Sequence, residues 1–445
     1  MDRRDFFRNT AVIAAAQGVG LKAFANVLED DGKEQQAKRE QQPLINSEPM
    51  LQNYAETSMG IAFSVTDMAN GYVVYGEKED LSDGRKVYCG GYRMTDMNND
   101  CMLVRLTGLK PATKYYYRIG ADRISYGGGY NMKVKENVER ETIYSFRTAG
   151  KAAEPHFCVI NDTHAQWESF GKVIDKVHEL NPSCVVWNGD ACNTEETVED
   201  QKQIFLYPAI SRRDYASRIP FLFSPGNHDG RGLANRHLER IWMYRQPEER
   251  DSRYWDLGRN YAVRMGDIAL IGLDTAEDKM DTNPKFANLY NSGPYREAQA
   301  LWLADALRQK EISSAKFLVA ICHIPLYDPR PNANPGDIAP DDKDPAYSTD
   351  FAAWQRTCAR LWTPLLEKAK CQLVITAHQH HYRYYAANKE RPWAEIVGGS
   401  PDCTPEKPKN FPTVIEGRVE DGRLRIDVHN ILTGEVKETL YFEAR

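Results

Sequence analysis

The feature that most constrains the fold of this chain is a series of six short apolar runs between His156 and His380. The runs read HFCVIND, CVVWNGD, PFLFSPGNHD, IALIGLD, KFLVAICHIP and CQLVITAHQH. Because apolar and polar residues do not alternate in them, they are typical of strands that are covered on both faces. Apolar residues recur at helical spacing from Phe170 to Leu180, between the first two runs. The pattern predicts an α/β domain in which strands and helices alternate.

Five of the six runs end in polar residues of the kinds that bind metal ions. They are Asp162 and His164 in the first run, Asp190 in the second, Asn227, His228 and Asp229 in the third, His323 in the fifth, and His378 and His380 in the sixth. In an open α/β sheet, the carboxyl ends of the strands border the crevice where ligands bind. One Asp or Asn at a strand end usually caps a turn or a helix. Five such endings in one series instead predict a metal centre.

The motifs DTH, GDAC, GNHD, CHIP and AHQH resemble, in the same order, those of the calcineurin-like metallophosphoesterases. That superfamily has the pattern DxH, GDxx, GNH[DE], a lone His and GHxH, and the resemblance covers His156 to about Tyr382. With a β-rich segment before it, the layout is most similar to purple acid phosphatases and their bacterial relatives. The resemblance implies an α/β four-layer metallophosphoesterase sandwich, preceded by an all-β fibronectin- or immunoglobulin-like sandwich.

The resemblance also implies two divalent ions, of Zn, Mn or Fe, and assigns their ligands. Asp162, His164 and His380 would hold the first ion, Asn227, His323 and His378 the second, and Asp190 would bridge both. Two ions about 4 Å apart polarise phosphoryl oxygens and lower the pKa of a shared water. If the backbone is still extended at His378 and His380, their side chains share one side.

The family pattern implies further roles for the residues of GNHD. A hydroxide that bridges the two ions would attack phosphorus in line. His228 would protonate the leaving group or donate a hydrogen bond to the phosphate, and Asp229 would fix the tautomer of His228. Asn227 and His228 are therefore the expected substrate-binding residues, and His228 and Asp229 the expected catalytic ones.

The chain departs from the purple acid phosphatase pattern at three positions. His164 stands where those enzymes have Gly, and Asn193 stands where they have a tyrosine that binds iron. Without that tyrosine we expect a colourless protein. Ala377 replaces the Gly before His378, which costs little unless the backbone there has a positive φ.

The natural substrate is open, because the metal core of this superfamily accepts phosphomonoesters, phosphodiesters and some pyrophosphates. The β-domain-first layout favours a phosphomonoesterase. A phosphodiesterase that acts on nucleotides or glycerophosphodiesters is the second hypothesis. A third is a binding module with an inert phosphoesterase core. Two long loops, at residues 230–255 and 327–350, are expected to govern substrate choice.

The N-terminus has the features of an export signal. Paired Arg3 and Arg4 precede a short apolar region and an A-x-A cleavage pattern that ends at Ala25. This arrangement resembles the twin-arginine motif and predicts a periplasmic or secreted protein. Residues 26–42 are polar without apolar periodicity and are expected to be a flexible linker.

The rest of the chain is expected to form two domains. Short β-prone runs separated by turn residues predict an all-β domain at 43–150. Within it, Leu109, Pro111 and Tyr115 resemble the strand-to-strand corner of fibronectin type III domains. The metallophosphoesterase domain would span 151–445 and end in antiparallel strands at a sheet edge.

Composition limits the classes of binding partner that are expected. The net charge of −6 argues against nucleic acid, and no apolar run approaches the roughly 20 residues of a membrane-spanning helix. The nine cysteines show no CxxC spacing, so no zinc cluster is predicted. The expected partner is a small phosphoester, and the oligomeric state is left open. Four histidines fit no motif and are expected to be structural: His156, His178, His237 and His429.

Overall fold

The computed structural model describes residues 42–89, 101–244, 257–279, 281–326, 345–389, 391–402 and 411–445, and for 345–353 only the backbone. The expected export signal at 1–25 and nearly all of the linker at 26–42 lie outside these residues. So do parts of the two loops expected to govern substrate choice, at 245–255 and 327–344. These expectations therefore stay predictions.

Two large sheets form the centre of the described structure. The first has the strand order β20 (Val436–Phe442), β19 (Arg423–Asn430), β18 (Thr413–Glu420), β9 (His156–Asn161), β10 (Cys184–Asn188), β11 (Phe221–Ser224), β1 (Met50–Gln52), β2 (Ser58–Ser64) and β5 (Cys101–Thr107). The second has the order β12 (Tyr261–Met265), β13 (Ile268–Leu273), β14 (Phe317–Cys322), β15 (Leu373–Thr376), β17 (Ala394–Val397) and β16 (Arg383–Tyr385). The six apolar runs are thus β9, β10, β11, β13, β14 and β15, and β18 to β20 form the expected antiparallel edge.

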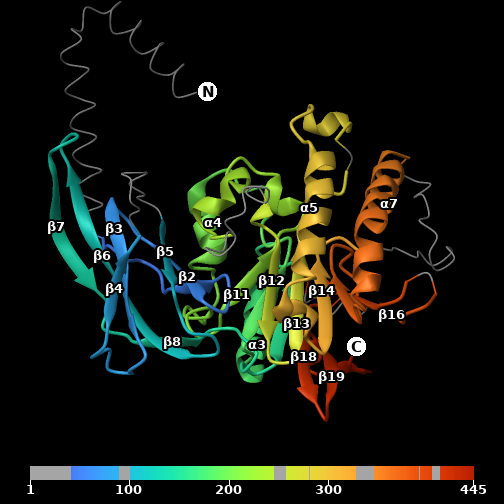
Figure 1. Cartoon of the computed structure of the whole chain (residues 1–445). Coiled ribbons are helices and arrows are strands. Elements are labelled where there is room, and N and C mark those ends of the chain that lie inside the picture. Colours follow the sequence, from blue (N-terminus) through green and yellow to red (C-terminus); the bar gives the residue numbers. More distant parts are fainter. Residues whose placement is uncertain are drawn as a thin grey trace, which may run out of the picture.

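The two sheets pack face to face, and helices cover their outer faces. Val159 of β9 and Val319 of β14 belong to one buried cluster between the sheets. On the outer face of the first sheet, α3 (Trp167–Leu180) and α4 (Val198–Phe205) pack on β9 and β10. On the second sheet, α5 (Ser292–Ala306) and α7 (Pro345–Lys368) lie side by side (Figure 1). This helix–sheet–sheet–helix order confirms the predicted four-layer sandwich.

The N-terminal strands form a β-sandwich, but one of its sheets is shared with the rest of the chain. A third sheet has the order β4 (Arg85–Tyr88), β3 (Ala69–Gly76), β6 (Lys114–Tyr126) and β7 (Met132–Glu139), with β8 (Tyr144–Arg147) also paired to β6. It packs on β2 and β5, which continue the first large sheet because β1 pairs in parallel with β11 at Gln52 and Phe221. Hydrogen bonding therefore crosses the expected boundary at residue 150, which stays a prediction.

A corner of the kind expected near Tyr115 is present in this sandwich. The hydroxyl of Tyr115 accepts a hydrogen bond of 3.0 Å from the backbone N–H of Lys110. A tyrosine that bonds back to the backbone a few residues upstream is the feature that holds such corners together. The contact supports the local resemblance noted in the sequence.

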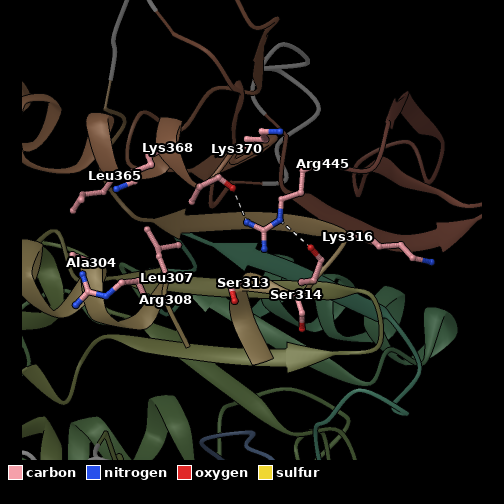
Figure 2. Close-up of a pocket in the computed structure, with 12 residues that line it drawn as sticks. Ala304, Leu307, Arg308, Ser313, Ser314, Lys316, Leu365, Lys368, Lys370 and Arg445 are labelled. Carbon is pink, nitrogen blue, oxygen red and sulfur yellow. Dashed lines mark hydrogen bonds between the residues drawn. The ribbon is translucent and has the colours of Figure 1, made fainter. Parts of the chain in front are cut away.

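A basic hollow lies where α5, α6 (Lys310–Ser313) and α7 end (Figure 2). The Arg445 guanidinium donates hydrogen bonds to the carbonyls of Ala315 and Ala369, at 2.9 and 2.7 Å, just beyond the ends of α6 and α7. Carbonyl groups at helix C-termini carry partial negative charge, so basic side chains there stabilise the helix ends. The hollow borders the residues that precede β14 and β15. It therefore lies at the amino ends of these strands, whereas the predicted ligands lie at the carboxyl ends.

Candidate metal centre

The carboxyl ends of the strands bring the predicted ligands together. The described residues contain two groups of potential ligand atoms. Within each group the atoms lie within 4.8 Å of one another, and both groups contain Asp190. The groups are Asp162, His164, Asp190 and His380, and Asp190, His323 and His378. Asp190 therefore lies where a carboxylate can bridge two ions, as the motif order predicts.

In the first group, side chains from three strand ends meet. Nε2 of His164 lies 3.2 Å from Nε2 of His380 and 3.6 Å from Oδ2 of Asp190. Oδ1 of Asp162 lies 3.3 Å from Nε2 of His380. The Nδ1 atom of His164 is 2.9 Å from Oδ1 of Asn193, whose amide donates back to the carbonyl of His164. Asn193 thereby places a proton on Nδ1 and leaves Nε2 of His164 free to bind a cation.

The second group is oriented in a similar way. Nδ1 of His323 lies 2.9 Å from the carbonyl of Asn188, and Nε2 lies 3.1 Å from Oδ2 of Asp190. Nδ1 of His378 lies 3.0 Å from Oδ1 of Asn227, which brings the predicted asparagine to this group. The backbone contact of His323 presents its Nε2 atom in a fixed direction.

The donor set fits divalent cations. Oδ1 of Asp162 is buried and forms no hydrogen bond within the described residues, which is unfavourable for a carboxylate unless a cation shares it. Burial opposes ionisation of Asp190, but the adjacent His323 holds the pKa of that carboxyl below its usual range. Burial likewise opposes protonation of His323, yet Asp190 and Asp162 raise its pKa to about 10. Imidazole, carboxylate and amide oxygen together suit Zn, Mn or Fe.

The backbone at the site differs from the sequence expectation for His378 and His380. β15 ends at Thr376, and both histidines have left-handed backbone, with φ of 69° and 54°. They are therefore not on an extended strand, and their separation by two residues does not place them on one side. A turn directs His378 to the second group and His380 to the first. Asp162, His164 and Asp190 also have positive φ, a conformation that stores strain at functional sites.

Two glycines are required by the close approach of the ligands. A Cβ atom on Gly189 would lie 2.3 Å from Nδ1 of His323, and one on Gly226 would lie 2.3 Å from Oδ1 of Asp190. Both are shorter than any stable contact, so these positions of GDAC and GNHD admit only glycine. Ala377 is not among the residues with positive φ, and alanine replaces glycine there without strain, as expected.

His228 lies beside the first group, but its partner differs from the expected one. Its ring is 5.0 Å from that of His164, and its Nε2 atom accepts a hydrogen bond of 3.0 Å from Nη1 of Arg231. The carboxylate of Asp229 instead accepts hydrogen bonds from the backbone N–H groups of Asp190, Cys192 and Gly226. The expectation that Asp229 fixes the tautomer of His228 is wrong: Asp229 joins two ligand loops, and Arg231 sets the tautomer.

A model of the calcineurin-like phosphoesterase family matches residues 155–382, about half of the chain. The chain belongs to this family. Two solved structures share the fold of this phosphoesterase. Purple acid phosphatase PPD1 from yellow lupin (Lupinus luteus) seeds is 13% identical with a TM-score of 0.59, covering 89% of this chain and 74% of its own. PhoD is 13% identical with a TM-score of 0.56, covering 91% and 94%. No curated protein matches the sequence.

In this phosphoesterase, the loop after β13 carries functional candidates that the sequence analysis missed. Glu277 and Asp278 are buried, and they contact Arg231 and His378. The fourth apolar run is the one run without a ligand motif. Acidic residues shortly after the end of that run were the available signal.

His178 and Tyr382 have structural contacts away from the two ligand groups. Nε2 of His178 lies 2.8 Å from the carbonyl of Tyr215, and the hydroxyl of Tyr382 donates to Glu438 on β20. His381 is exposed.

Among the described helices of this phosphoesterase, none is long and apolar enough to cross a membrane.

Proposed function

We propose that this metallophosphoesterase is an exported phosphomonoesterase that holds two divalent ions. The observation that carries the proposal is the position of Asp190 in both groups of potential ligand atoms. A buried carboxylate shared by two clusters of imidazoles is suited to hold two cations close together against their repulsion. When bound, the two ions would polarise the phosphoryl oxygens and make a water molecule nucleophilic near neutral pH.

The chain's own residues would bind and orient the ester. Asn227 and His228 lie in the loop after β11 and contact the two ligand groups. Because Arg231 donates to Nε2 of His228, the neutral imidazole carries its proton on Nδ1, which is buried and forms no hydrogen bond within the described residues. Burial, with Arg231 adding to its effect, lowers the pKa of His228 to about 4. His228 would therefore donate a hydrogen bond to the ester from Nδ1.

Turnover of two nitrophenyl esters tests the substrate class. The rates for p-nitrophenyl phosphate and bis(p-nitrophenyl) phosphate are compared with Mn²⁺ or Zn²⁺ added. Faster hydrolysis of the monoester is expected. Preference for the bis ester would replace the proposal with a phosphodiesterase, and a chain that binds no metal and hydrolyses neither ester would be a binding module.

Cell fractionation tests export. The Arg3–Arg4 pair, the apolar region and the cleavage pattern that ends at Ala25 support this part of the proposal. The double variant Arg3→Lys, Arg4→Lys is expected to stay in the cytoplasm at its full length. Release of this variant outside the cytoplasm at the same rate as the wild type would contradict twin-arginine export.

A further inference from the structure

A buried carboxylate lies behind one of the proposed ligands of the second ion. Oδ2 of Asp278 is 3.5 Å from Nε2 of His378, while Nδ1 of the same ring faces Asn227. Asp278 is 2% exposed. A carboxylate on the far nitrogen of a metal-binding imidazole fixes the direction of the ring and raises its basicity. Asp278 is thus in position to aim Nδ1 of His378 at the second ion.

The neighbouring carboxylate, Glu277, holds the arginine that contacts His228. Nε and Nη2 of Arg231 donate to the two oxygens of Glu277, at 2.9 and 2.7 Å. Such a two-point contact fixes the plane of the guanidinium. The Nη1 atom of Arg231 is then directed at Nε2 of His228, 3.0 Å away. Glu277 therefore acts on His228 through one intervening residue.

The charges of this loop compensate one another. Arg231 also donates to Asp278 at 3.3 Å, and the ammonium of Lys279 contacts both Asp278 and Glu277. Two buried carboxylates are thus matched by two cations. A buried ionic network of this kind is tolerated when its members are paired, and removal of one member leaves an uncompensated charge.

The loop that carries Glu277 and Asp278 is held in place from α5 and α7. Arg296 donates to the carbonyls of Thr275 and Glu277, at 3.0 and 3.1 Å. Trp354 donates to the carbonyl of Thr275, and the hydroxyl of Tyr290 accepts from the backbone N–H of Glu277. A loop with so many backbone anchors can hold side chains in one geometry, which a positioning function requires.

We propose that Asp278 and Glu277 are positioning residues for the two halves of the site, an inference that rests on the proposed dinuclear function. Asp278 orients His378 toward the second ion, and Glu277 orients His228, through Arg231, toward the phosphoester. The loop after β13 thus sets both the affinity of the second ion and the direction of the group that contacts the ester.

Metal titration tests the role of Asp278 without any assay of activity. Mn²⁺ or Zn²⁺ is titrated by calorimetry into the metal-free wild type, Asp278→Ala and Asp278→Asn. We expect Asp278→Ala to bind one ion as the wild type does and the other about 10- to 100-fold more weakly. Asp278→Asn, which preserves the shape of the side chain, should restore part of the affinity.

Asp281→Ala is the matched control for Asp278→Ala. Asp281 lies on the same connection and accepts hydrogen bonds from the backbone N–H groups of Ser292 and Gly293 at the start of α5. Its loss is expected to lower stability and leave both metal affinities unchanged. If Asp278→Ala binds both ions like the wild type, or if Asp281→Ala loses the second ion equally, the role of Asp278 is overturned. A wild type that binds two ions but hydrolyses no phosphoester would instead overturn the proposed function.

Steady-state kinetics with the ester preferred by the wild type test the role of Glu277. Glu277→Gln weakens the two-point contact with Arg231 and is expected to lower kcat about tenfold or more while both ions stay bound. Loss of metal without a specific fall in kcat would show that Glu277 acts on the ligands and not on His228. Thermal melting of each variant shows whether it is folded.

Discussion

Oδ2 of Asp190 lies 3.1 Å from Nε2 of His323, and the same oxygen lies 3.6 Å from Nε2 of His164. One carboxylate oxygen is therefore adjacent to both proposed metal positions, and cation binding should stabilise the folded chain. At a free metal concentration 100-fold above Kd, the free energy of unfolding is expected to rise by about 3 kcal/mol. Removing metal with a chelator should lower Tm, and Asp190→Ala should abolish this response. An unchanged Tm in the wild type would contradict the metal centre.

Gly226→Ala is expected to disrupt the site through Asp190. The added Cβ would lie 2.3 Å from Oδ1 of Asp190 and 2.5 Å from its backbone nitrogen, so the proposed bridging carboxylate must move. We expect loss of at least one ion per chain, measured by elemental analysis, and a large fall in phosphoesterase activity. The control is Gly230→Ala, because a Cβ there meets nothing within 4 Å. Full metal content in Gly226→Ala would argue against the bridging role.

Asn193→Ala should weaken the first metal position. Oδ1 of Asn193 is 2.9 Å from Nδ1 of His164, and without it the ring can rotate or change its tautomer. Loss of such a partner lowers metal affinity by about 10- to 100-fold. Calorimetric titration measures this, with Thr194→Ala at the exposed neighbouring position as the control. Equal affinities in the two variants would show that His164 needs no partner.

His228→Ala should impair turnover while the metal ions stay bound. The ring of His228 lies 5.0 Å from that of His164, yet its Nε2 accepts from Arg231, and its buried Nδ1 has no hydrogen-bond partner within the described residues. Loss of the group that donates a hydrogen bond to the ester is expected to lower kcat by about 100-fold or more. His237→Ala serves as the control, because that histidine is exposed. Retained kcat in His228→Ala would remove the residue from the mechanism.

The strands and the set of clustered side chains were accessible from the sequence because both depend on local pattern. A continuous apolar run specifies a strand covered on both faces, and a polar residue directly after it falls at the strand end, as for Asp162 and His323. Because these strands pair in parallel, their carboxyl ends lie together, and the polar residues that follow them cluster there. The identity of the ligand residues was carried by the family motifs, and not by the pattern alone.

The hydrogen-bond partners of Asp229 and Asp278, and the backbone conformation of His378, could not be predicted in this way. Asp229 is next to His228 in sequence, yet its carboxylate accepts hydrogen bonds from the N–H groups of Asp190 and Cys192, which are 39 and 37 residues away along the chain. Asp278 meets His378 only because β13 and β15 lie in the same sheet. The backbone N–H of His378, where φ is positive, donates to Oδ2 of Asp162 at another strand end. Such features depend on the packed fold and leave no periodic signal in the sequence.

A buried carboxylate on β18 gives a prediction for stability against pH. Glu416 is 4% exposed and lies 2.9 Å from Nε2 of His156 and 3.0 Å from Nε2 of His429, and it also pairs with Arg418. Burial opposes its ionisation, but these three partners hold the pKa of the carboxyl well below its usual range. Because the folded-state pKa is lower than the value of about 4.3 in an unfolded chain, ionised Glu416 stabilises the fold above that pH. The contribution is lost as the pH falls through the folded-state pKa.

Glu416→Gln should therefore lower the free energy of unfolding by roughly 3 kcal/mol at pH 7, because the variant removes the buried carboxylate that His156, His429 and Arg418 share. The difference from the wild type should shrink as the pH is lowered below about 4, where the carboxyl of the unfolded wild type takes up a proton. Urea unfolding at pH 7 and pH 3 measures both values. Glu420→Gln is the matched control on the same strand, since the half-exposed Glu420 pairs with Arg425 and should change stability by less than about 1 kcal/mol. A difference between Glu416→Gln and the wild type that grows toward acid pH would mean that Glu416 destabilises the fold when ionised.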